Sequence, residues 1–263
     1  MSESQEKASA LQRHGRDCRL CTGPLDFAFT MAFQPIVDLS SGVLYGHEAL
    51  VRGPAGESAA SILAKVTPAS LYRFDQACRI RALELAHELG STSLLSINFL
   101  PNAVYEPQAC IQATLDISEK LGWPTNRISF EITETEYVRD RAHMQNIINA
   151  YRAMGFTTAL DDFGAGYANL GLLVDLHPDV LKIDRELIID IDHSPRRQAI
   201  VDSVISLAER LDIRLIAEGV ETLQEARWLY QQGILVQQGY FYARPQTQAL
   251  PVVDEQTIIA VRA

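Results

Sequence analysis

The chain has 263 residues, a formal net charge of −10 and 47% hydrophobic residues. This length suits a single α/β barrel, which needs about 250 residues, and the hydrophobic content excludes a disordered chain. The acidic balance argues against duplex nucleic acid and anionic membranes as partners. The sequence has no apolar run of about 18 residues that could span a membrane and no apolar secretory segment at its start, so we predict a cytoplasmic protein.

Residues 1–25 are polar and are predicted to form a flexible N-terminal tail, followed by a single domain over residues 26–263. The tail carries Cys18 and Cys21 in a CxxC arrangement. The two residues could be half of a zinc site or a redox pair, but structural zinc needs four ligands and there is no second CxxC. We therefore interpret them as incidental thiols.

From residue 31 onward, apolar runs typical of strands alternate with amphipathic helical patterns. The predicted strands cover Met31–Asp38, Val43–Arg52, Leu94–Leu100, Arg127–Thr133, Thr157–Asp162, Val180–Asp184, Arg214–Glu218 and Leu235–Gly239. The clearest helical patterns cover Arg73–Leu89, Pro107–Leu121, Arg139–Met154, Arg196–Leu211 and Leu223–Gln232. This alternation indicates βα units with a mainly parallel sheet, and eight strands in this length favour a closed barrel.

The first two predicted strands are separated only by Leu39–Gly42. A connection this short cannot join parallel neighbours, so one strand near the start is predicted to run against the others. The predicted fold class is therefore α/β, a modified (β/α)8 TIM-like barrel with one antiparallel strand near the start. Residues 53–72 form a long connection with a small helical piece, and such connections often shape a binding site.

Polar residues stand near the carboxyl ends of most predicted strands. Because side chains alternate between the two faces of a strand, the apolar positions should face the helices and the other positions the barrel axis. Barrel active sites are built at the carboxyl ends of the strands. The residues with this placement are Glu48, Asn98, Glu131, Asp161, Asp162, Lys182, Glu218 and Gln238.

Five of these residues are carboxylates and only one is a lysine. Two carboxylates about 4 Å apart repel by roughly 4 kcal/mol at an effective dielectric of 20, so the group needs counter-charge. Hard divalent cations supply it, and Mg²⁺ or Mn²⁺ suits a set of Asp, Glu and Asn ligands. Asp161 and Asp162 are adjacent, and residues 163–166 can break the strand so that both carboxylates face one place. One of them could then bridge two ions that clamp a phosphodiester.

The order of these residues resembles the EAL phosphodiesterase family over about residues 29–248. The ordered set of motifs is specific, whereas each motif alone is weak. The motifs stand here as Gln34-Pro35-Ile36-Val37, Glu48-Ala49-Leu50-Val51-Arg52, Asn98-Phe99-Leu100-Pro101, Phe130-Glu131-Ile132-Thr133-Glu134, Asp161-Asp162-Phe163-Gly164-Ala165-Gly166-Tyr167, Lys182-Ile183-Asp184, Ala217-Glu218-Gly219-Val220-Glu221, Gln238-Gly239-Tyr240 and Arg244-Pro245. Many relatives have Thr at the position of Ala165 and Ser-Ser at Ala168-Asn169, which leaves loop rigidity and dimer coupling open.

The resemblance implies hydrolysis of cyclic di-GMP to linear pGpG with two Mg²⁺ or Mn²⁺ ions and inhibition by Ca²⁺. By motif, the ligands of one ion are Glu48, Asn98, Glu131 and Asp161. Those of the second ion are Asp161, Asp162 and Glu218, the last directly or through water. The catalytic group is Lys182, which orients or deprotonates the attacking water, with Gln238, Glu48 and Glu218.

The resemblance also assigns substrate contacts to Gln34, Arg52, Asp184, Gln238 and Pro245. Glu134 is expected to anchor the loop over Asp162–Leu170 and to couple the site to a dimer interface. Glu221 either supports the site or caps the next helix.

A homodimer and a sensor or regulator acting in trans are the expected partners. Two alternatives stay open, a catalytically silent cyclic di-GMP receptor and a regulatory interaction module.

Overall fold

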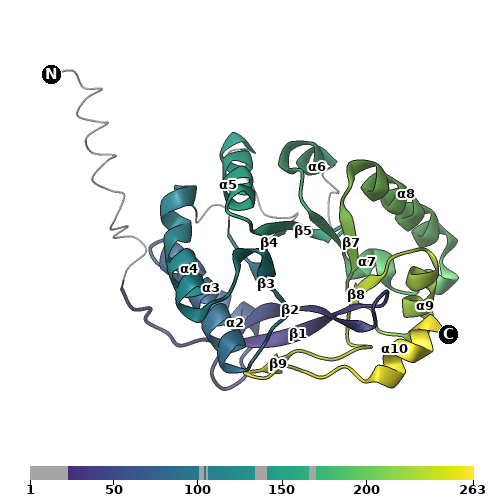
Figure 1. Cartoon of the computed structure of the whole chain (residues 1–263), viewed down its shortest axis with the longest axis horizontal. Helices are drawn as coiled ribbons and strands as arrows, with labels where there is room; N and C mark the ends of the chain where they lie inside the picture. Colours follow the sequence, from purple (N-terminus) through teal and green to yellow (C-terminus); the bar gives the residue numbers. More distant parts are fainter. Residues whose placement is uncertain (1–22, 101–103, 105, 134–140, 166–169) are drawn as a thin grey trace.

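The computed structural model of the chain describes residues 23–100, 104, 106–133, 141–165 and 170–263. In this part of the chain the strands close into a barrel with helices around its outside (Figure 1). The ring runs from β1 to β8 in sequence order, and β9 pairs with β1 outside the ring. The strands are β1 Thr30–Asp38, β2 Val43–Arg52, β3 Leu94–Asn98, β4 Ile128–Thr133, β5 Thr157–Phe163, β6 Val180–Ile183, β7 Arg214–Ala217, β8 Val236–Gln238 and β9 Gln246–Thr247.

Strand direction follows the predicted scheme. Strands β2 to β8 run parallel to one another, whereas β1 is antiparallel to both β2 and β8. In the tight turn after β1, the Asp38 carboxylate accepts hydrogen bonds from the backbone N–H and the hydroxyl of Ser40 at 2.8 and 2.6 Å. Gly42 has a φ of 78°, which residues with a Cβ rarely adopt. The prediction of a barrel with one antiparallel strand near the start is confirmed.

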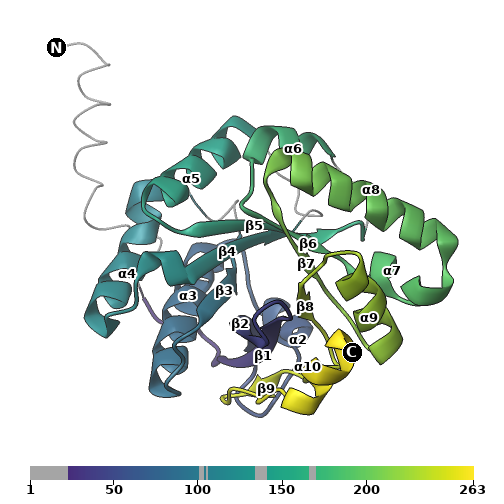
Figure 2. The ribbon, with the colours of Figure 1, turned by 45° about the vertical axis from the view of Figure 1, so that its right-hand side comes forward.

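The larger helices surround the ring, and α10 packs beside α9 (Figure 2). Their bounds are α2 Ala59–Leu63, α3 Leu71–Glu88, α4 Pro107–Leu121, α5 Arg141–Ala153, α6 Leu170–Leu176, α7 Arg185–Ile188, α8 Pro195–Leu211, α9 Leu223–Gln231 and α10 Glu255–Arg262. The sequence analysis missed α6, α7, α10 and β9, because elements this short show little periodicity. Among the helices of the described residues, none has the length and apolar character needed to cross a bilayer.

Apolar side chains pack on both sides of the strands. The larger core lies between strands and helices and contains an aromatic cluster of Phe99, Phe130, Tyr151 and Phe156, with ring centroids 5.0 to 6.0 Å apart. The smaller core lies inside the ring, and its buried members are Ile36, Ala159, Val180, Ile216 and Val236. Strand alternation therefore places one apolar set outward and a second one on the axis.

A polar layer lies above the inner apolar core, at the end of the barrel where β2 to β8 terminate, which we call the mouth. Side chains on one face of a strand recur at every second residue. Each residue of this layer is therefore two positions away from a member of the inner core. These residues are Gln34, Asp161, Lys182, Glu218 and Gln238.

Candidate active site

A cavity of about 420 Å³ opens at the mouth of the barrel. Its lining includes most of the residues that the sequence singled out, namely Gln34, Glu48, Asp161, Asp162, Asp184, Glu218 and Gln238. Glu131 and Lys182 lie beneath this lining, with only 1% and 0% of their surfaces exposed. The ring thus collects side chains from seven strands and strand ends at one place.

Three carboxylates form what we call the first carboxylate group, which consists of Glu48, Glu131 and Asp161. One oxygen atom from each lies within 4.8 Å of the others. Asn98 adjoins this group, because its side-chain amide donates a hydrogen bond to Glu48 Oε1 at 3.0 Å. These residues come from neighbouring strands β2, β3, β4 and β5 in the ring, so the closure of the barrel positions them.

The second carboxylate group consists of Asp161, Asp162 and Glu218, with the same spacing of oxygen atoms. The β5–β6 register shifts between Leu160 and Phe163, and Asp162 has a φ of 56°. This irregularity turns Asp162 toward the same place as Asp161, although alternation would send the two side chains apart. The sequence analysis attributed the turn to residues 163–166, whereas the backbone turns earlier, at Asp162 itself.

Lys182 lies between the two carboxylate groups. Its Nζ atom is 2.6 Å from Glu218 Oε1, 2.9 Å from Glu131 Oε2 and 3.0 Å from Asp161 Oδ1. Glu48 Oε2 is farther away, at 3.8 Å. A single ammonium group therefore faces four carboxylates in a site where its own side chain has no exposed surface.

This crowding changes the protonation of the site. Burial raises the pKa of Glu131 to about 8, even though Lys182 opposes the shift. Burial and the neighbouring Asp161 raise the pKa of Glu218 well above its ordinary value, and the same two causes raise that of Asp162 to about 6. Burial lowers the pKa of Lys182, but the four carboxylates outweigh it and raise that pKa well above its usual range. Lys182 is therefore an ammonium group.

The donor set fits divalent cations. Asp161 belongs to both carboxylate groups. Within the described part of the chain its buried Oδ1 atom accepts no hydrogen bond, although Lys182 Nζ lies nearby. That contact has the length of a hydrogen bond but not its angles, so we regard it as an ion contact alone. Hard cations favour such free carboxylate oxygens. Added positive charge would also lower the raised pKa values of these carboxyl groups.

Two glutamines complete the floor of the cavity. The Gln238 amide donates hydrogen bonds to Glu48 Oε2 at 2.7 Å and to Gln34 Oε1 at 3.2 Å. Gln34 in turn donates to the Ala243 carbonyl at 3.3 Å. The Gln238 Oε1 atom is buried and has no hydrogen-bond partner among the described residues, so it can accept a hydrogen bond from a bound molecule.

A buried ion pair that the sequence analysis missed supports the end of β3. Asp75 and Arg79 on α3 pair at 2.6 Å with side chains that are each 2% exposed. The second carboxylate oxygen of Asp75 accepts a hydrogen bond from the Leu100 N–H at 2.9 Å, two residues after Asn98. Asp75 and Arg79 stand four residues apart in a helical pattern, and this spacing could have predicted the pair from the sequence. Many exposed pairs have the same spacing, so it does not identify a buried one.

Not all predicted site residues reach the cavity. Arg52 donates a hydrogen bond to the Val51 carbonyl at 2.7 Å, and neither it nor Pro245 belongs to the lining. Asp184 lies at the cavity but also caps α7, where its carboxylate accepts from the Glu186 N–H at 2.7 Å. Their substrate roles stay predictions. Glu134, predicted to anchor a loop, lies outside the described residues.

Glu221 does not cap the helix that follows it. The N-cap of α9 is Thr222, which forms a capping box with Glu225. The Glu221 carboxylate instead pairs with Arg185 at 3.1 Å, and both residues line the cavity. The sequence analysis did not select Arg185, because a lysine or arginine after a strand is usually a solvated charge.

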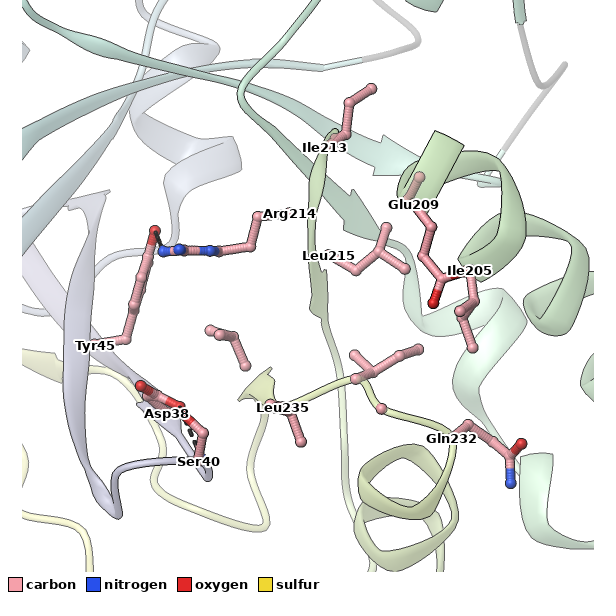
Figure 3. Close-up of a pocket in the computed structure, with 14 residues that line it drawn as sticks. Asp38, Ser40, Tyr45, Ile205, Glu209, Ile213, Arg214, Leu215, Gln232 and Leu235 are labelled. Atoms are coloured by element: carbon pink, nitrogen blue, oxygen red, sulfur yellow. Dashed lines mark hydrogen bonds between the residues drawn. The ribbon is translucent and has the colours of Figure 1, made fainter. Parts of the chain in front are cut away.

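Another cavity, of about 330 Å³, lies at the opposite end of the barrel (Figure 3). Arg214 extends from β7 toward Tyr45 on β2, and its guanidinium donates to the Tyr45 hydroxyl at 3.3 Å. Asp38 and Glu209 also line this cavity. Among the described residues, none of the predicted site residues lines this cavity.

We expect the ion-free protein to lose thermal stability as the pH rises from about 5 to about 8. A carboxyl group whose pKa is higher in the folded than in the unfolded state makes folding take up protons, so stability falls between the two values. That window runs from 4.5 to about 8 for Glu131 and from 3.8 to about 6 for Asp162. Melting temperatures in the presence of a chelator measure the effect. The Glu131→Gln variant should show a shallower decline, and a wild-type melting temperature that rises over this range would contradict the expectation.

The fold and the site define a (β/α)8-type barrel protein with a carboxylate-rich centre suited to divalent cations. The chain belongs to the EAL domain family, whose profile matches residues 26–245.

Relatives and solved structures agree with this assignment. The chain is 34% identical over 225 residues to the blue light- and temperature-regulated antirepressor BluF of Escherichia coli strain K12, covering 84% of this chain and 55% of that protein. It is 31% identical to the probable cyclic di-GMP phosphodiesterase PdeG of the same strain, covering 82% of this chain and 44% of PdeG. The chain thus spans about half the length of these curated relatives.

Among solved structures, a standalone versatile EAL protein from Vibrio cholerae O395 in its c-di-GMP bound form is 45% identical. It superposes with a TM-score of 0.86 over 89% of this chain and 99% of that chain. The Klebsiella pneumoniae BlrP1 manganese/cy-diGMP complex at pH 9.0 is 32% identical, with a TM-score of 0.79 over 94% of this chain and 67% of that chain.

Proposed function

We propose that this chain is a metal-dependent phosphodiesterase that hydrolyses cyclic di-GMP to linear pGpG. The observation that carries the proposal is the pair of carboxylate groups that share Asp161, with the Lys182 ammonium between them. The c-di-GMP bound structure of a similar protein and the name of PdeG support the choice of substrate. As part of this proposal, the active unit is the domain over residues 26–263.

Two Mg²⁺ or Mn²⁺ ions are the cofactors that this donor set fits best. The first carboxylate group with Asn98 would hold one ion, and the second carboxylate group would hold the other. Bound divalent ions neutralise the carboxylates, polarise a phosphodiester and make water a better nucleophile at neutral pH. Ca²⁺ is larger and tolerates looser coordination than Mg²⁺, so we propose that it fills the site and inhibits turnover.

Lys182 positions the attacking water. Its Nζ atom is paired with carboxylates, at 2.9 Å from Glu131 Oε2 and 2.6 Å from Glu218 Oε1. When those carboxylates turn toward ions, the ammonium loses partners and can donate a hydrogen bond to water. The free Gln238 Oε1 atom can accept a hydrogen bond from the same water, which would then be held from two sides.

A second candidate function is nucleotide binding without turnover. It is favoured by one finding, the 34% identity to BluF, whose name describes an antirepressor. A receptor of this kind would use the same cavity and act through a partner protein.

We expect the purified protein to convert cyclic di-GMP to pGpG with Mn²⁺, and to stop when a chelator or excess Ca²⁺ is added. Product formation is followed by chromatography, and nucleotide binding with Ca²⁺ by calorimetry. Glu48→Ala should abolish turnover, because it removes a carboxylate of the first group. Tight binding by the wild type without any product, with either Mg²⁺ or Mn²⁺, would favour the receptor instead.

A homodimer and a regulator acting in trans are further parts of the proposal. Leu170 and Val174 on α6 are 55% and 71% exposed and offer an apolar surface for a second copy. Light scattering at several protein concentrations measures the oligomeric state.

A further inference from the structure

The cavity at the mouth has an uneven distribution of charge. Six carboxylates line it, and Arg185 is the only basic residue among the described residues of its lining. Lys182 lies buried beneath the lining, and Arg52 is turned to the Val51 carbonyl outside it. An anionic substrate that enters this cavity therefore meets Arg185 as the one cation of its described lining.

The backbone around Arg185 brings its side chain close to the second carboxylate group. Arg185 begins α7 directly after β6, the strand that carries Lys182. Its side chain crosses Gly219, where an added Cβ would overlap the Arg185 side-chain carbons. Gly219 follows Glu218, a member of the second carboxylate group, so the Arg185 side chain lies beside that group. Its Nε atom is 3.1 Å from Glu221 Oε1.

The contact with Glu221 is easily exchanged. The two side chains are 47% and 41% exposed, and ion pairs this exposed contribute little to stability because water screens them. A phosphodiester offers the guanidinium the same pairing with two oxygen atoms that a carboxylate offers. Substrate can therefore replace Glu221 as the partner of Arg185 at small energetic cost.

Cyclic di-GMP carries two phosphodiesters with one negative charge each. Only one of them can be hydrolysed at the carboxylate groups at a time, so the other needs a separate cation. We propose that Arg185 binds the phosphodiester that is not being hydrolysed, and that Glu221 holds the guanidinium at the cavity wall until substrate replaces it. The identity of the substrate in this proposal rests on the proposed function.

The Arg185→Gln variant tests the contact. Loss of a charge-assisted hydrogen bond should raise KM for cyclic di-GMP by about tenfold to hundredfold with a much smaller change in kcat. The Kd for cyclic di-GMP with Ca²⁺, measured by calorimetry, should rise by a similar factor. The ratio of kcat/KM for cyclic di-GMP to that for bis(p-nitrophenyl) phosphate, which has a single phosphate, should fall to the same extent. Arg185→Lys, which keeps the charge, should recover part of the loss.

The Glu221→Gln variant gives a second test, because it should change KM and Kd in the direction opposite to Arg185→Gln. Glu221→Gln frees Arg185 and should lower KM and Kd for cyclic di-GMP. If Glu221 instead supported the binding of the ions, the same substitution would raise both constants. In the Arg185→Gln background the benefit of Glu221→Gln should shrink, and a double-mutant cycle measures this coupling. Arg81→Gln is the matched control, because Arg81 forms an exposed pair with Glu88 on α3, outside the barrel mouth.

The outcomes separate this inference from the proposed function. If the wild type turns over and Arg185→Gln leaves KM and Kd within about twofold, the inference is wrong and the function stands. The inference is also wrong if Arg52→Gln carries the whole effect. If the wild type binds cyclic di-GMP without turnover, the Kd of Arg185→Gln still decides the contact. A wild type that neither binds nor hydrolyses the nucleotide overturns both.

Discussion

Replacing Asp161 by asparagine should lower kcat/KM for cyclic di-GMP by about 10³-fold or more and weaken Mn²⁺ binding. Asp161 is the only residue that belongs to both carboxylate groups found among the described residues. Asparagine keeps the shape of the side chain but removes its charge and one of its two oxygen atoms, so the two proposed ions would lose a shared ligand. A thousandfold loss corresponds to about 4 kcal/mol of transition-state stabilisation, which is within what metal ions supply.

Calorimetric titration with Mn²⁺ and the turnover assay measure the two effects separately. Asp162→Asn should have a smaller effect on binding, because Asp162 belongs only to the second carboxylate group. Asp38→Asn is the matched control, since Asp38 lies in the cavity at the opposite end of the barrel (Figure 3). Undiminished Mn²⁺ affinity in Asp161→Asn would refute the shared-ligand arrangement.

Replacing Lys182 by methionine should lower kcat by about 10²- to 10⁴-fold, the range typical of a lost proton-handling or water-positioning group. In contrast to Asp161→Asn, Mn²⁺ affinity should be kept or increased, because a positive charge 2.6 to 3.8 Å from four carboxylates has been removed. This combination would distinguish a group that acts on water from a group that holds ions.

The same variant should also be less stable without ions, by about 3–5 kcal/mol at pH 8, because the buried carboxylates lose the ammonium group that faces them. The difference from wild type should shrink toward pH 5, because burial raises the pKa of Glu131 to about 8 and this group is then protonated. Chemical denaturation at the two pH values measures it, with the exposed Lys120→Met as control. A kcat within about tenfold of wild type would remove Lys182 from the proposed mechanism.

Much of the candidate site could be predicted from the sequence because strands impose a period of two. Every strand of the ring was predicted to within two residues at each end. Glu131 and Ile132 lie on opposite faces of β4, and Lys182 and Leu181 lie on opposite faces of β6. Alternation alone therefore predicted that the charged residues face the barrel axis. The tight Leu39–Gly42 turn likewise predicted the antiparallel β1, because a local connection decides whether neighbouring strands can be parallel.

The residues that the sequence analysis missed depend on longer-range geometry. Arg185, which the sequence analysis did not select, is the one basic residue in the described lining of the cavity, and the absence of a Cβ at Gly219 leaves room for its side chain. The phosphate contact of Arg52 stays a prediction. The bulge at Asp162 depends on the pairing of β5 with β6. Neither feature has a periodic signal in the chain.

By itself, the sequence determined the strands, their facing, the acidic character of the mouth and the motifs of the EAL family, because these follow from local periodicity and residue order. The tertiary structure alone decided which charges meet. Lys182 reaches Glu131 across 51 positions of the chain, and Gln34 meets Gln238 across 204. Such pairs form only when the ring closes, and burial then sets their protonation, because desolvation depends on the whole barrel and not on neighbours in sequence.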